Sequence, residues 1–165
     1  MGWDKGIDYD FYRGWFENYL KYSRSNRRYT YTAILYTQLL NGSRISEAVR
    51  AIIEFVKTGN RELRVKLSKR KRDEYRLIIV PELIDRDRCR WICDLEEDKI
   101  VDRVKTFCRD RYHINTHSLR YAFITHLLKK NINPLIIAKI TKHSKLDFTT
   151  YMEEAEKILR DSVKG

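Results

Sequence analysis

The chain has few of the residues that build disulfide frameworks, rigid turns or membrane spans. Its 165 residues include three cysteines, two prolines and six glycines, and no window approaches 18 uninterrupted apolar residues. The first ten residues lack the basic and apolar regions of a signal peptide. We therefore expect a soluble, intracellular protein with no membrane partner.

The cysteine pattern also argues against disulfide and metal frameworks. Cys89, Cys93 and Cys108 are an odd number in a chain without secretory features, so a disulfide framework is not expected. Together with His113 they match no standard zinc spacing. We expect half-buried helix thiols instead, and no metal or other cofactor.

Two further features of the sequence concern function: it lacks a nucleotide-binding motif, and it has an excess of positive charge. The chain has no Gly-rich phosphate loop and no alternation of strands with helices, which argues against a nucleotide-binding fold. Lys and Arg number 34 against 23 Asp and Glu, a formal net charge of +11. Such a surface attracts a polyanion, and nucleic acid is favoured over an acidic membrane. A basic but inert surface is the alternative.

Hydrophobic periodicity predicts a mainly α-helical domain with one small antiparallel β-sheet, an α+β fold. Asn41-Gly42 is a strong helix stop, because both residues tolerate a left-handed backbone. The segments "RELRVKLS" and "YRLIIVP" surround a polar turn and predict a hairpin. Helices are expected over residues 7–22, 29–40, 43–57, 83–95, 98–110, 117–128, 134–140 and 147–159.

An arginine stands at the head of an apolar helical stripe in "THSLRYAFITHLL". On a helix that begins near His117, Arg120 shares a face with His117 and with the apolar residues Phe123, Ile124, Leu127 and Leu128. A charge in this position is costly unless an anion meets it. The partner is either an internal carboxylate or an external phosphate, and the motif alone does not separate the two.

Other groups could also meet a phosphate. Arg44 lies between the Asn41-Gly42 stop and the next helix, where free helix N–H groups favour an anion, although it could be a solvated loop arginine. The turn "SKRKR" carries Lys69 at a hairpin tip, where charges are usually only solvated. The segment "KHSKLDFTTY" contains His143 and, eight residues later, Tyr151 near the start of a helix.

Taken in order, "NGSRISEA", the lysine in "LSKRKR", "HSLR" and "KHSKLDFTTY" resemble the active-site signature of the tyrosine recombinases, the phage-integrase family of site-specific DNA recombinases. The resemblance covers about residues 30–155, and its specificity lies in the ordered combination. It implies a mainly helical catalytic domain with a small sheet. It also implies six catalytic residues: Arg44, Lys69, His117, Arg120, His143 and Tyr151.

The sequence departs from the family pattern around the second histidine. Lys142 takes the place of the glycine that usually precedes it, and the gap from His143 to Tyr151 is one residue shorter than usual. The interval from Arg44 to Tyr151 is compact, as in integrases of archaeal viruses and plasmids. These departures leave open whether Tyr151 serves its own active site or a neighbour's.

The hairpin lysine is open as well. Ser68-Lys69 fits the family's placement best, but Lys71 lies on the same turn and Lys66 lies in the strand. Candidate DNA contacts outside catalysis are Arg70, Lys71, Arg72 and Lys142.

The resemblance implies an enzyme that cleaves and rejoins DNA through a covalent 3′-phosphotyrosine link without metal or ATP. Its partners would be double-stranded attachment sites and other copies of itself, as a tetramer on DNA, in the host cytoplasm or nucleoid. A type IB topoisomerase or an inactive DNA-binding module of the same fold are the alternatives. Residues 1–27 are expected to form an N-terminal helix and basic connector, and residues 28–165 the catalytic domain of a longer integrase.

Overall fold

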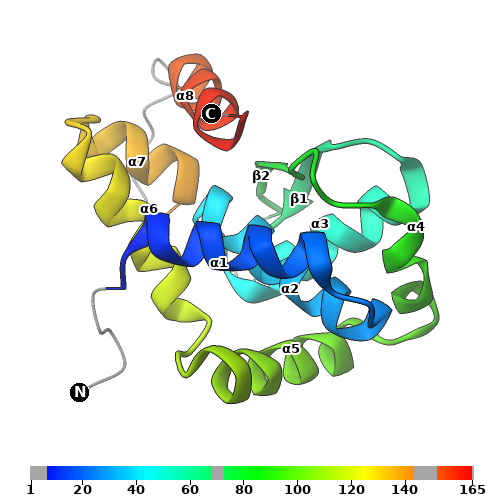
Figure 1. Ribbon diagram of the computed structural model, residues 1–165. Coiled ribbons are helices and arrows are strands. Elements are labelled where there is room, and N and C mark those ends of the chain that lie inside the picture. Colours follow the sequence, from blue (N-terminus) through cyan, green and yellow to red (C-terminus); the bar gives the residue numbers. More distant parts are fainter. Residues whose placement is uncertain (1–6, 68–72, 143–151, 165) are drawn as a thin grey trace.

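The computed structural model describes residues 7–67, 73–142 and 152–164 (Figure 1). In chain order the elements are α1 (Tyr9–Tyr22), α2 (Asn26–Asn41), α3 (Ile45–Thr58), β1 (Glu62–Lys66), β2 (Tyr75–Ile79), α4 (Arg86–Cys89), the 3₁₀ helix η1 (Arg90–Asp94), α5 (Glu97–Tyr112), α6 (His117–Lys129), α7 (Pro134–Thr141) and α8 (Met152–Lys164). The described part of the chain is therefore mainly helical with a two-stranded antiparallel sheet, which confirms the predicted mixture of elements.

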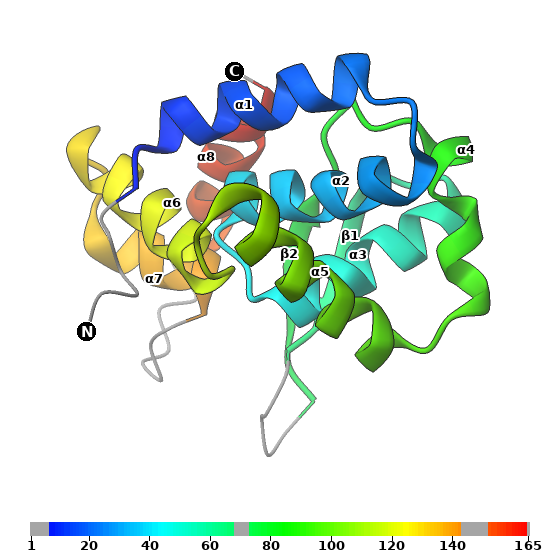
Figure 2. The same cartoon turned by 60° about the horizontal axis from the view of Figure 1, so that its bottom comes forward.

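Helix α2 lies at the centre of the molecule. Every residue from Tyr29 to Asn41 is buried, because α1, α3, α5 and α6 all pack against it (Figures 1 and 2). The helix begins three residues before its predicted start, since the side chain of Ser25 accepts a hydrogen bond from the backbone N–H of Arg28. It ends as predicted, with Gly42 in the left-handed conformation.

The two strands pair in antiparallel register from Glu62 opposite Ile79 to Lys66 opposite Tyr75. Strand β1 alternates, with Leu63 and Val65 buried and their neighbours exposed. Strand β2 does not alternate, and residues 76–79 are all buried. The reason is that α2, α7 and α8 lie against β2, so neither face of that strand meets solvent beyond Tyr75.

The predicted helix over residues 83–95 is wrong. The chain instead forms the short helix α4, capped by Asp85, and then the 3₁₀ helix η1. Long-range contacts explain the interruption. Arg88 stacks 3.9 Å from the ring centre of Tyr29, and the indole N–H of Trp91 donates to the hydroxyl of Thr30 at 2.9 Å. These contacts with α2 hold the segment in two short turns that local periodicity does not reveal.

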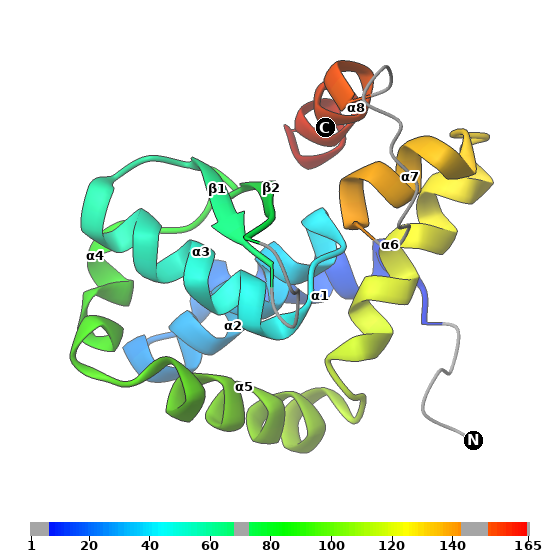
Figure 3. The same ribbon diagram turned by 180° about the vertical axis from the view of Figure 1, so that it is seen from behind.

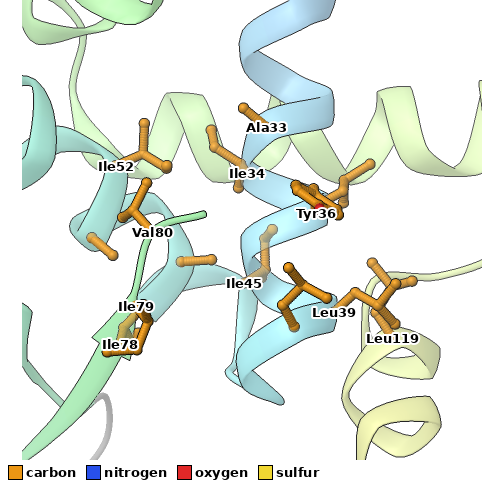
Figure 4. Close-up of a cluster of buried hydrophobic side chains, with 14 of the residues drawn as sticks. Ala33, Ile34, Tyr36, Leu39, Ile45, Ile52, Ile78, Ile79, Val80 and Leu119 are labelled. Carbon is orange, nitrogen blue, oxygen red and sulfur yellow. The ribbon is translucent and has the colours of Figure 1, made fainter. Parts of the chain in front are cut away.

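The hydrophobic core forms where α2, α3, β2 and α6 meet. Ala33, Ile34, Tyr36 and Leu39 of α2 face the strand residues Ile78 and Ile79, the following Val80, the α3 residues Ile45 and Ile52, and Leu119 of α6 (Figure 4). All of these residues are buried. The same core positions the ends of α2 and β2 and the starts of α3 and α6. Within the described ranges, no helix is both long enough and apolar enough to cross a membrane.

Candidate functional site

The site is built around the short connection between α2 and α3, residues 42–44. Arg120 in the first turn of α6 is fully buried. Its Nη1 donates to the carbonyl of Gly42 at 3.0 Å, and its Nη2 donates to the carbonyl of Thr141 at 2.9 Å. Two of its partners are therefore main-chain carbonyls at the C-terminal ends of α2 and α7. The sequence alternatives, a carboxylate or a phosphate, had not included this kind of partner.

Gly42 makes the close approach of α6 possible. Its φ is +62°, and a Cβ atom at this position would lie 2.2 Å from the Phe123 side chain. Phe123 is one turn beyond Arg120 on the same helix and is fully buried. The glycine therefore ends α2 and also leaves room for the helix that carries Arg120.

Not all of the predicted stripe on α6 faces the core. Phe123 and Leu127 are buried, but Leu128 is 44% exposed, so its placement in the stripe is wrong. His117 is exposed, whereas Arg120, predicted to share its face, is fully buried. His117 is the first residue of α6, where no preceding turn covers it, and its ring meets Tyr121 edge-on at 4.9 Å. An exposed imidazole remains accessible to a docking ligand.

Arg44 is the N-cap residue of α3 and is one-third exposed. Its backbone N–H donates to one carboxylate oxygen of Glu47 at 3.2 Å, and its Nη1 donates to the other oxygen at 3.3 Å. Glu47 is fully buried. The carboxylate thus holds the loop and the guanidinium together, and it leaves part of Arg44 at the surface.

Arg76 in β2 is a third guanidinium in this region, and the sequence analysis missed it. It is 1% exposed; its Nη2 donates to the carbonyl of Asn41 at 2.7 Å and its Nε to the carbonyl of Leu77 at 3.2 Å. Burial lowers the pKa of Arg76 to about 10; the carboxylate of Glu47 opposes this shift, and Arg120 and Arg44 add to it. All three charges are thus close enough to act on Arg76.

The sequence pattern expected of a hairpin strand gave no indication that Arg76 is buried. A polar residue beside Tyr75 in "YRLIIVP" reads as a solvent-facing position, because one face of a two-stranded sheet is usually exposed. Only the packing of α7 and α8 on β2 makes position 76 internal. No local signal in the sequence could have identified it.

Lys142 is the C-cap residue of α7, in the left-handed conformation with φ 59°. This conformation favours glycine, which agrees with the glycine expected there by family resemblance. Burial lowers the pKa of Lys142, and Lys139 and Arg76 lower it further against the opposing effects of Glu74 and Glu156. The lysine therefore lies among charges of both signs, two basic and two acidic.

The remaining predicted site residues lie outside the described residues. These are Lys69, Arg70, Lys71 and Arg72 in the hairpin turn, and His143 and Tyr151 between α7 and α8. Their roles stay predictions. In sequence, His143 directly follows Lys142, and Tyr151 directly precedes Met152, the first residue of α8.

Within the described ranges, no group of three His, Cys, Asp or Glu side chains is arranged to hold a metal ion. Cys89 and Cys108 are fully buried, and Cys93 is exposed, so the prediction of half-buried thiols is wrong. Burial raises the pKa of Cys89 to about 11 and that of Cys108 to about 12. Both thiols are therefore protonated at neutral pH, the less reactive form.

Comparison with known proteins identifies related viral and archaeal proteins. "Putative integrase ORF241" of Acidianus two-tailed virus is 39% identical over 130 residues, which cover 78% of this chain and 53% of the viral protein. "Uncharacterized protein MJ0770" of Methanocaldococcus jannaschii is 32% identical over 96% of this chain and 88% of that protein. "Putative integrase V10" of the Sputnik virophage is 30% identical over 88% of this chain and 82% of that protein.

The matches differ in how much of each relative they cover. The chain spans about half the length of the Acidianus protein but more than four-fifths of the other two. No family model matches the chain. No solved structure matches it either.

Proposed function

This chain belongs to the same family as the virophage integrase V10, and on that premise we propose that it is a site-specific DNA recombinase of the tyrosine type. It would cleave and rejoin DNA at attachment sites through a covalent 3′-phosphotyrosine link, without metal or ATP. The observation that carries the proposal is the hydrogen bond from Arg120 to Gly42 in the residue 42–44 connection. That connection also carries Arg44, 76 residues earlier in the sequence.

Two arginines suit the charge that develops in this reaction. When a phenol oxygen attacks a DNA phosphodiester, the five-coordinate phosphorane gains negative charge on its non-bridging oxygens. Guanidinium groups are always charged at neutral pH and can donate paired hydrogen bonds to such oxygens. Arg44, one-third exposed, is the group best placed to meet the phosphate first.

Arg120 has a second role in this proposal. Because it ties the carbonyls of Gly42 and Thr141 together, it holds the α2–α3 connection against the end of α7. It also adds a fixed positive charge in a site that excludes water, where electrostatic stabilisation of a transition state is strongest. His143, the next residue but one after Thr141, would donate a further hydrogen bond to the phosphate.

The proton transfers need an acid and a base. The Tyr151 oxygen would form the bond to phosphorus as its proton passes to His117, because a phenol with a pKa near 10 seldom ionises unaided at neutral pH. The bond from phosphorus to the 5′ oxygen would break as Lys69 protonates that oxygen. A DNA 5′-hydroxyl then reverses the step, so strand exchange conserves the bond energy.

The first prediction tests the nucleophile. Tyr151→Phe should bind a nicked attachment-site duplex as tightly as the original protein and form no covalent protein–DNA adduct on a denaturing gel. The matched control is Tyr22→Phe, because Tyr22 is 75% exposed at the end of α1 and should keep full adduct formation.

Other outcomes of the same assay separate the alternatives. An adduct that survives Tyr151→Phe would contradict the nucleophile assignment. Relaxation of any supercoiled plasmid by dilute protein would favour a type IB topoisomerase. If the original protein binds duplex DNA but forms no adduct, the chain is a DNA-binding module of the family.

A further inference from the structure

A small cavity lies beside the arginine cluster, between β2, α7 and α8. Its volume is about 100 Å³, roughly three times the share of one water molecule in the liquid. Figure 3 shows α8 next to α7, and strand β2 also contacts α8. Arg76 lines this cavity and hydrogen-bonds to Asn41, three residues before Arg44. Arg76 therefore links the cavity to the candidate site.

The cavity wall is strongly cationic. Among the described residues, its charged lining consists of Arg64, Arg76, Lys139, Lys142 and Glu156. The carboxylate of Glu156 forms a two-pronged ion pair with Arg64, with one N–O distance of 2.9 Å. The other three charges of the lining are positive. The described lining therefore carries more positive than negative charge, which favours an anion.

One buried donor in the wall lacks a partner. Of the three guanidinium nitrogens of Arg76, Nε and Nη2 donate to backbone carbonyls, but Nη1 is buried without a hydrogen bond. Buried charged donors are almost always paired, because an unsatisfied one loses its hydration and gains nothing. An anion in the cavity that Arg76 lines would supply the missing acceptor.

Lys142 adds a conformational argument. Its left-handed backbone would suit glycine better, so a lysine at this position is strained. Residues held in such conformations cluster at active sites and ligand-binding sites. The side chain in question borders the cationic cavity, and Lys139, 9% exposed, lies one turn earlier on α7.

From these observations we infer that Arg76, Lys139 and Lys142 form a second phosphate site, which holds the DNA backbone phosphate next to the one that is cleaved. The inference rests on the proposed recombinase function and adds a positioning role to it. Holding the neighbouring phosphate would fix the register of the DNA strand, so that the scissile phosphate meets Arg44. A DNA phosphate is favoured over free phosphate because the cavity adjoins the candidate site and the chain carries a net charge of +11.

The test measures how DNA binding depends on salt, with Tyr151→Phe as the background so that no cleavage occurs. Each phosphate contact contributes about 0.9 to the slope of log K against log salt. The double variant Lys139→Met, Lys142→Gly should reduce the magnitude of this slope by about 0.9 and weaken binding. Fluorescence anisotropy on duplex DNA measures both. The glycine should also raise Tm by about 2–4 °C, because it relieves the left-handed strain.

A matched control variant is Lys99→Met, Asn131→Gly. It removes one exposed lysine on α5, relaxes another left-handed residue with φ 61°, and leaves the cavity untouched. It should keep the original salt slope. A salt slope unchanged in the cavity variant would overturn the inference.

A second arm uses inorganic phosphate as the probe. If millimolar phosphate raises Tm of the original protein while the cavity variant binds DNA with an unchanged slope, the site takes free phosphate and the inference fails. The DNA-binding measurement does not depend on whether the protein cleaves DNA. If the original protein, with Tyr151 intact, forms no adduct but the cavity variant alters the slope, the recombinase proposal is rejected. The phosphate site is then kept, on a DNA-binding module.

Discussion

At the scale of single residues, Gly42 has two constraints that act together. Its left-handed backbone ends α2, and its missing side chain lets Phe123 pack against the connection that carries Arg44. A glycine chosen only for a helix end would tolerate asparagine, which also adopts this conformation. Here the close approach of Phe123 excludes any Cβ atom. The Asn41-Gly42 stop is therefore also a packing site for α6.

A prediction at this scale concerns two glycines. Gly42→Ala should lower the free energy of unfolding by about 2 kcal/mol or more, because it combines overpacking with an unfavourable φ. Gly14→Ala is the control: it lies inside α1 with no atom within 4 Å of the added Cβ, and should raise stability by about 0.5–1 kcal/mol. Urea unfolding of both variants measures the difference. Equal stability of the two variants would contradict the role given to Phe123.

Arg120 shows how main-chain carbonyls help to satisfy a buried charge. Helix C-termini carry partial negative charge on their last carbonyls, and Arg120 donates to the carbonyl at the C-cap of α2 and to that of the last residue of α7. Replacing this guanidinium would therefore disturb both helix ends. Variants of Arg44, which is partly exposed, are the cleaner probes of catalysis.

At the scale of elements, α8 packs on its own chain. Ala155, Leu159 and Val163 are buried against α7, β2 and α2. Two ion pairs join α8 to β1: Arg64 with Glu156, and Arg160 with Glu62 at 3.0 Å. In sequence, Tyr151 directly precedes Met152, the first residue of α8. We therefore propose that Tyr151 attacks DNA held by its own active site.

A mixing experiment tests this proposal. Arg44→Gln and Tyr151→Phe should each fail to form an adduct, and an equimolar mixture should also fail, because no protomer holds both groups. One variant carries a tag that changes its size, so that the position of a covalent adduct on a denaturing gel shows which variant is joined to the DNA. An adduct on the Arg44→Gln chain would show instead that the tyrosine is donated to a neighbour. Mixing each variant with the original protein controls for inhibitory association.

At the scale of the whole molecule, net positive charge would govern the proposed encounter with DNA. The formal charge of +11 is distributed among 34 basic residues, and many of those described are paired with acidic groups or backbone carbonyls, as Arg50 is with Glu97 at 2.6 Å. The charge available to phosphates is therefore smaller than the total. The slope of binding against salt measures this available charge directly.

We expect duplex affinity to fall by about 10³ or more between 50 and 200 mM salt, as for proteins that make six to ten phosphate contacts. Fluorescence anisotropy across this range provides the measurement. Near-constant affinity would mean that the basic surface is inert, which is the alternative that composition alone had left open. The measurement needs no attachment site, because the phosphate contribution is independent of base sequence.

The amino-acid sequence by itself determined the mainly helical fold, the hairpin, the end of α2 at Gly42 and the position of Arg44 at a helix start, because periodicity, caps and turn residues act between near neighbours. Only the tertiary structure decided that residues 83–95 form two short turns, that Arg120 bonds to carbonyls, and that Arg76 is internal. Each of these depends on contacts between segments distant in the chain, which no local pattern encodes. The strain at Lys142 likewise became visible only with the backbone angles of the folded protein.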